Sequence, residues 1–143
     1  MNSIERLLDL DVSGIGTREE GVVEISLSKL GGEVFAFPIQ ELDNATRAAV
    51  MENSFHIVNG PDGAEAKTNL YGVAKMTIVE GCIIFKDKRY RDKFNVRSGE
   101  ALVDKMLTLS EAIKLSDAIQ ELGNDEGTSL LEDLEGLKGE IKN

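Results

Sequence analysis

The sequence predicts an α+β fold in a single domain, with an N-terminal β-hairpin packed on a mostly helical body of about four to five helices. Residues 22–28 alternate apolar and polar side chains, as a half-buried strand does, and a glycine pair leads to a second apolar strand. From residue 98 to 122, apolar side chains recur at the spacing of an amphipathic helix. A chain of 143 residues is long enough to bury a core of its own.

Three parts follow one another along the chain. Residues 1–20 are expected to form a short amphipathic helix, capped by Ser3, and a flexible glycine-containing linker. Residues 21–123 are expected to form the α+β domain. Residues 124–143 form an acidic tail whose leucines recur at helical spacing, although Gly136 and Gly139 weaken a helix there.

The hairpin is the clearest strand prediction. Val23, Ile25 and Leu27 share one face of the first strand, and Gly31-Gly32 is a turn signal of the primed hairpin type. The second strand, over residues 33–39, is expected to end at Pro38, because proline cannot donate to a strand ladder. A two-stranded hairpin is marginal alone, so its apolar face needs helices to pack on.

The middle of the chain is less regular. Residues 42–53 read as a helix capped by Asp43 or Asn44, and residues 59–67 read as an exposed loop rich in turn residues. Residues 68–85 fit both a helix and a strand, since apolar residues at helical spacing are mixed with β-branched ones. The length of the periodic part favours a helix over about residues 66–80.

Two helices are expected between residues 98 and 122. Ser98 is a good N-cap for the first, and Thr108 with Glu111 forms the pattern of a capping box for the second. Gly123 is a helix stop. The pair does not fit a DNA-binding helix-turn-helix, because the second helix carries three acids and only Lys114 as a base.

Composition limits the class of protein. The net charge of −10 and an aromatic content of 5% without tryptophan disfavour binding to nucleic acid, whose phosphates would be repelled. No apolar run is long enough to cross a membrane, and the first residues lack the basic start and apolar run of a signal peptide. The single Cys82 fits a reducing compartment. We therefore expect an intracellular, cytoplasmic protein with no membrane partner.

The sequence offers no catalytic, cofactor-binding or metal site. His56 is the only histidine and reads as a half-buried residue, since no second ligand lies at zinc spacing. Cys82 lies among apolar neighbours, which raise the pKa of a thiol instead of activating it. Gly14 and Gly16 do not form a dinucleotide fingerprint. We therefore expect a protein without enzymatic activity and without cofactors.

Candidate partner-binding residues come from two regions of uneven charge. Residues 86–97 hold six basic side chains, and the candidates among them are Lys86, Lys88, Arg89 and Arg91. The tail holds six acids against two lysines and an apolar stripe, Leu130, Leu131, Leu134 and Leu137. The two regions either attract each other or are both simply solvated. The stripe either binds a partner helix or packs on the chain's own core.

The order of these features resembles the XkdN-like tail assembly chaperones of tailed phages. The clearest part has the pattern L-V-x-K-x-L-x-x-x-E-I-x-x-L-x-x-x-I-x-x-L. Eight positions of this chain match it: Leu102, Val103, Lys105, Leu107, Glu111, Leu115, Ile119 and Leu122. Ala112 stands where the pattern has isoleucine. The resemblance extends over most of residues 20–122.

The resemblance implies a non-enzymatic role in assembly. Chaperones of this kind bind the long, apolar tape measure protein, keep it soluble and help tail tube subunits polymerise around it. The expected partners are therefore the tape measure protein and the tail tube protein, with self-association as a further expectation. A structural tail or head-completion component of the virion is the alternative, and an enzyme built from scattered carboxylates is a third possibility.

Overall fold

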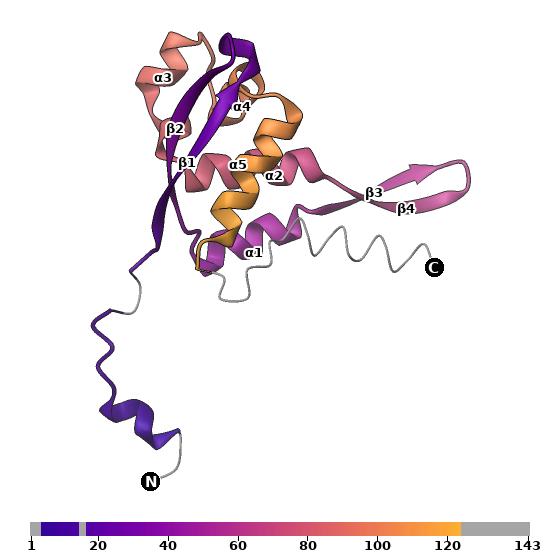
Figure 1. Ribbon diagram of the computed structural model, residues 1–143. Coiled ribbons are helices and arrows are strands. Elements are labelled where there is room, and N and C mark those ends of the chain that lie inside the picture. The colour runs from indigo at the N-terminus through magenta and orange to yellow at the C-terminus, as the bar shows by residue number, and fades with distance from the viewer. Residues whose placement is uncertain (1–3, 15–16, 124–143) are drawn as a thin grey trace.

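The computed structural model describes residues 4–14 and 17–123, except for the side chains of residues 55–58 and 66–68. Figure 1 shows a body of helices with one β-hairpin along its side and a second hairpin projecting from it. The elements are η1 (Glu5–Asp9), β1 (Glu20–Leu27), η2 (Ser28–Leu30), β2 (Glu33–Gln40), α1 (Asn44–Glu52), β3 (Phe55–Gly60), β4 (Gly63–Thr68), α2 (Leu70–Gly81), η3 (Ile83–Lys86), α3 (Lys88–Lys93), α4 (Gly99–Met106) and α5 (Leu109–Glu121). The predicted α+β class is confirmed.

Strands β1 and β2 form the predicted N-terminal hairpin, antiparallel from Glu20↔Gln40 to Leu27↔Glu33. Its inward face is apolar and buried, as the alternation predicts: Ile25, Leu27, Phe37 and Ile39 are all at most 6% exposed. The connection differs from the expected two-residue turn. It holds five residues, with the short η2 followed by Gly31 and Gly32 at φ +76° and +80°, a conformation that glycine adopts without strain.

Pro38 does not end the second strand, contrary to the prediction. It lies inside β2, opposite Val22, and β2 continues to Gln40. Each strand of a two-stranded sheet has one open edge, and a proline is accommodated where its nitrogen faces such an edge.

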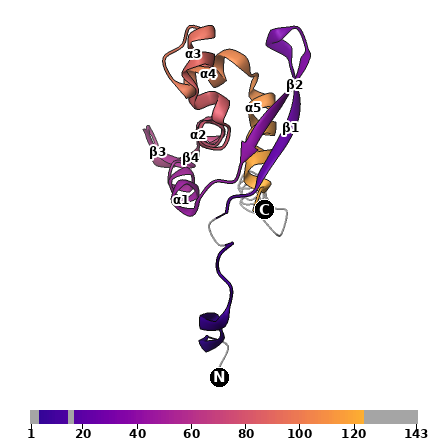
Figure 2. The same cartoon turned by 90° about the vertical axis from the view of Figure 1, so that its left-hand side faces the viewer.

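The core forms between the hairpin and the helices behind it. Helix α2 crosses α5, and both pack with α4 and η3 under the inward face of β1 and β2 (Figure 2). The side chains that fill this space are mostly apolar. The largest of those fully buried are Phe37, Phe85, Ile25, Leu27, Ile78, Leu102, Leu107, Leu115 and Ile119.

The helix pair α4–α5 confirms the sequence prediction. Ser98 Oγ accepts from the backbone N–H of Ala101 at 3.0 Å, which caps α4. The capping box of α5 is complete, because Thr108 Oγ1 accepts from Glu111 N–H and a carboxylate oxygen of Glu111 accepts from Thr108 N–H. After α5 the chain turns at Gly123, whose φ is +72°.

The predicted loop over residues 59–67 and the predicted helix start at residue 66 are wrong. Residues 55–68 form a second antiparallel hairpin, β3–β4, in which Gly60 pairs with Gly63 around Pro61 and Asp62. Helix α2 starts only at Leu70, where the side chain of Asn69 accepts from the backbone N–H of Gly72. An Asp-Gly pair is a turn signal for a hairpin, and this one closes β3–β4.

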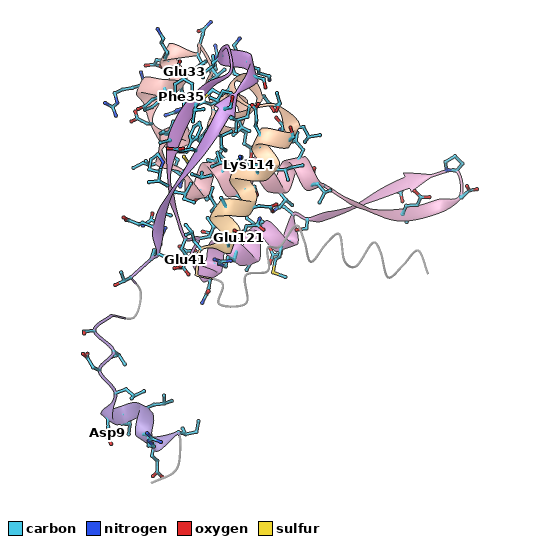
Figure 3. The ribbon with its side chains drawn as sticks, viewed as in Figure 1. Asp9, Glu33, Phe35, Glu41, Lys114 and Glu121 are labelled. Atoms are coloured by element: carbon cyan, nitrogen blue, oxygen red, sulfur yellow. The ribbon has the colours of Figure 1, made fainter. Side chains whose placement is uncertain are left out.

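Two short helices also differ from expectation. The basic stretch contains helix α3, which the sequence analysis did not predict and which Asp87 caps by accepting from Arg89 N–H. Near the N-terminus, residues 5–9 form the short 3-10 helix η1 instead of an α-helix, without a side-chain cap. This segment lies away from the body, and Figure 3 labels Asp9 on it.

Candidate partner-binding surface

An open groove of about 630 Å³ lies where the hairpin meets the ends of α2 and η3. Four stretches of chain supply its lining: Arg18, Glu20, Gly21 and Val22; Pro38, Ile39 and Gln40; Glu80 and Gly81; Ile83 and Lys86. Ile39 is buried at 6% exposure, while Val22 and Ile83 are 68% and 73% exposed. The groove therefore combines buried apolar surface with two exposed apolar side chains.

The exposure of Ile83 follows from the short η3 helix. Cys82 and Phe85 are three residues apart, which places them on the same side of a 3-10 turn, and both are buried in the core. Ile83 then points away from that core. The exposure of this β-branched side chain is therefore a consequence of burying its neighbours.

The groove continues onto the sheet surface that we call the hairpin outer face. It includes Val22, Val34, Ala36 and Pro38 together with the polar Glu24 and Ser26, which all lie on the side of β1–β2 that does not face the helices. No described helix covers this face, as Figure 2 shows for the hairpin at the side of the molecule. Exposed apolar side chains that gather on one face are typical of sites that bind protein partners.

Two ion pairs border the groove. Lys86 Nζ lies 2.7 Å from Glu80 Oε2, and an Arg18 guanidinium nitrogen lies 3.5 Å from Asp43 Oδ2. The side chains of Arg18 and Lys86 remain 40% and 50% exposed. Both cations are therefore still within reach of an approaching carboxylate.

The structure separates the four predicted basic candidates. Lys86 lines the groove, whereas Lys88 and Arg89 lie at the start of α3, where they pair with Asp92 and Asp87 and have side chains 78% and 82% exposed. Arg91 donates to the backbone oxygen of Arg97 at 3.2 Å. The apolar candidates Leu130, Leu131, Leu134 and Leu137 lie outside the described residues, and the side chain of His56 is also not described.

The described groups with the largest pKa shifts stay protonated at neutral pH. Burial raises the pKa of the Cys82 thiol to about 11, as its apolar sequence neighbours predict. Burial and a hydrogen bond to Asp104 raise the pKa of Tyr71 to about 12. Among the residues that the structure describes, no group of three or more metal-binding side chains comes together, and no helix is long and apolar enough to cross a membrane.

Comparison with models of protein families assigns the chain to a family. A model of the phage XkdN-like tail assembly chaperone proteins matches residues 4–136. The chain belongs to this family. The match covers the whole described body and extends into the tail, so the resemblance stated from the sequence is confirmed. Comparisons with curated proteins and with solved structures give no match.

The groove itself was not predicted from the sequence. One signal for it was present, because residues 34–39 are all apolar, and a strand that is apolar on both faces is typical of a strand covered on both faces. Ile83 and Ile84 in the run before Phe85 gave a similar signal. Nothing in the sequence indicated that these two runs would lie side by side.

Proposed function

We propose that this member of the tail assembly chaperone family binds the tape measure protein, keeps it soluble and promotes assembly of the tail tube around it. The family match over residues 4–136 carries the proposal. The role is non-enzymatic and is performed in the cytoplasm of the bacterial host, with the tail tube protein as a second partner.

The groove and the hairpin outer face are the surface we assign to the tape measure protein. An amphipathic helix binds by laying its apolar side chains into an apolar groove, and Val22, Ile39 and Ile83 offer such surface. Lys86 and Arg18 at the border favour a helix with acidic flanking residues. Several copies along one long partner would gain avidity without strong single contacts.

Co-expression tests this proposal. The chain is produced together with the tape measure protein encoded in the same gene cluster, and the soluble fraction of the tape measure protein is measured with and without it. We expect the soluble fraction to rise several-fold and the two proteins to co-purify. Unchanged solubility together with no co-purification would contradict the proposal.

Mass spectrometry of purified particles separates the chaperone from a structural component. A chaperone leaves before the particle is complete, so its peptides should be absent. Stoichiometric amounts of the chain in mature particles would instead identify a structural tail or head-completion protein.

A further inference from the structure

We propose that the groove is occupied, in the absence of a partner, by residues 130–137 of the same chain. The described chain ends beside the groove. Leu122 lies next to the groove residue Gly21, with its Cδ2 atom 3.5 Å from the point where a Cβ on Gly21 would stand. Gly123 N–H donates to Glu19 Oε2 at 2.6 Å. The tail therefore leaves the body at the end of the groove, near Glu41, which Figure 3 labels beside Glu121.

The tail is also long enough to reach the groove. Six residues, 124–129, separate Gly123 from Leu130 and span up to about 20 Å when extended. Residues 130–137 as a helix are about 12 Å long. A segment of this size reaches the groove without moving any part of the described body.

The tail and the groove are chemically complementary. Leu130, Leu131, Leu134 and Leu137 recur at the spacing that places them on one helical face, and the groove offers the apolar surface of Val22, Pro38, Ile39 and Ile83. The tail carries six acids against two lysines, and the exposed cations Lys86, Lys88 and Arg89 lie on the elements beside the groove. Glu20 and Glu80 also line the groove and repel the acidic tail, which offsets part of its attraction to the cations. The leucines therefore determine where the tail binds, and the cations only adjust its affinity.

The consequence is a competition between the tail and a partner helix for the same surface. This consequence rests on the proposed function, whereas docking of the tail itself does not. A chain whose groove is covered would not associate with other apolar proteins until a partner displaced the tail. The family model extends to residue 136, so the matched range includes most of the leucine stripe.

Disulfide trapping in the full chain tests the docking. Cysteines replace Val22 and Leu134 together, and the rate of cross-linking is measured in dilute solution under mild oxidation. The native Cys82 is buried with a pKa of about 11, so it does not compete. The matched control joins Leu134→Cys to Leu109→Cys, because Leu109 is 57% exposed at the opposite end of α5 from Gly123.

We expect the Val22 pair to cross-link within one chain at least ten-fold faster than the Leu109 pair. Adding Leu131→Asp to the Val22 pair should slow the reaction at least ten-fold while the thermal unfolding of the body stays unchanged. Equal rates for the two pairs would overturn the proposal. A covalent dimer as the main product would overturn it in favour of a second copy.

The N-terminal segment also carries exposed apolar side chains, since Ile4, Leu7 and Leu8 are each more than half exposed. Faster cross-linking of a Val22→Cys/Leu8→Cys pair than of the Leu134 pair would assign the groove to that segment and overturn the proposal.

Addition of tape measure protein to the same assay distinguishes docking of the tail in the groove from binding of the tape measure protein to the groove. Slower cross-linking in its presence supports both tail docking and the groove as its binding surface. Fast cross-linking that the tape measure protein does not change supports tail docking and contradicts that binding surface. Normal binding of the tape measure protein without any preferential cross-linking contradicts tail docking alone.

Discussion

Gly81 lies where α2 meets α5 and the end of β2. A Cβ atom on this residue would stand 2.4 Å from Ile119 Cγ2 and 3.2 Å from the backbone oxygen of Gln40. Gly81 is the last residue of α2 and lies against α5 and β2, so packing leaves no room for a side chain. The glycine that weakens the helix prediction from the sequence is therefore required by the fold.

Substitution of this glycine is expected to destabilise the fold. Gly81→Ala gains helix propensity but forces Ile119 and the neighbouring backbone to shift, so we expect the free energy of unfolding to fall by about 1–3 kcal/mol. Urea denaturation measures this change in the free energy of unfolding. Gly14→Ala is the control, since no atom lies within 4 Å of a Cβ there, and its effect should stay below about 0.5 kcal/mol. Equal stabilities for the two variants would contradict the close approach.

Glu111 joins α5 to the connection between β1 and β2. Its carboxylate accepts from Thr108 N–H at 3.0 Å, from Ser28 N–H at 3.2 Å and from Ser28 Oγ at 2.9 Å. Burial raises the pKa of this carboxyl, but the hydrogen bonds from Thr108 and Ser28 outweigh it, and the net pKa is lowered. The same side chain therefore completes a helix cap and holds the tip of the hairpin.

This lowered pKa predicts the sign of a pH effect. A carboxyl whose pKa is lower in the folded state stabilises the fold above its ordinary value, near 4.5, and loses that contribution as the pH falls through the folded value. Glu111→Gln should cost about 1 kcal/mol at pH 7, and the difference from the original chain should shrink below about pH 4.5. Urea denaturation at several pH values measures this difference. Glu121→Gln, at the other end of α5, should show no such pH-dependent loss, and identical pH profiles for both variants would refute the role of Glu111.

At the scale of elements, the hairpin is held to the helical body by an aromatic contact. The rings of Phe37 in β2 and Phe85 in η3 are stacked with centroids 6.1 Å apart and planes at 21°. Both side chains are fully buried. An isolated two-stranded hairpin is marginal, so this contact and the aliphatic side chains around it determine whether β1–β2 forms.

Truncation of the Phe37 side chain should therefore lower the free energy of unfolding much more than truncation of a side chain on the opposite face of the same strand. Phe37→Ala is expected to lower the free energy of unfolding by about 3–5 kcal/mol, and Phe37→Leu by less. Val34→Ala, at 59% exposure on the hairpin outer face, should change it by less than about 0.5 kcal/mol. Thermal and urea unfolding of the three variants measure the difference. Similar losses for Phe37→Ala and Val34→Ala would mean that the hairpin does not depend on its buried face.

Elements with strong local signals were predictable from the sequence, and elements without them were not. The caps at Ser98 and Thr108 are formed by residues three positions apart, so the sequence alone reveals them. The hairpin β3–β4 was missed because its second strand, residues 63–68, is short and rich in alanine and charged residues, which are poor strand formers. Helix α3 was missed because its six residues carry no apolar stripe.

The candidate site was less predictable than the fold. Its lining comes from four stretches of chain, and only tertiary packing brings Ile83 to Val22 and Pro38, which the hairpin already pairs. Sequence patterns report periods within one element, and they do not report which elements lie side by side. The predicted basic candidates show this, since Lys86 lines the groove while Lys88 and Arg89 belong to the neighbouring helix α3.

At the scale of the whole molecule, a net charge of −10 is combined with apolar surface that the described body leaves open. A net charge far from zero favours solubility, and exposed apolar side chains such as those of the groove and the hairpin outer face are typical of partner-binding surfaces. An assembly chaperone needs both properties, because it must remain soluble while binding a protein that is not. This combination is the physical basis of the proposed function.

The most direct test of this account is the yield of soluble tape measure protein co-purified with groove variants of the chain. Ile83→Asp places a charge in the apolar lining of the groove, and the 73% exposure of Ile83 means that the fold should tolerate the substitution. Leu109→Asp is the control, at 57% exposure on α5. The account predicts that Ile83→Asp lowers the yield at least ten-fold while Leu109→Asp leaves it unchanged. Equal yields with both variants would contradict it.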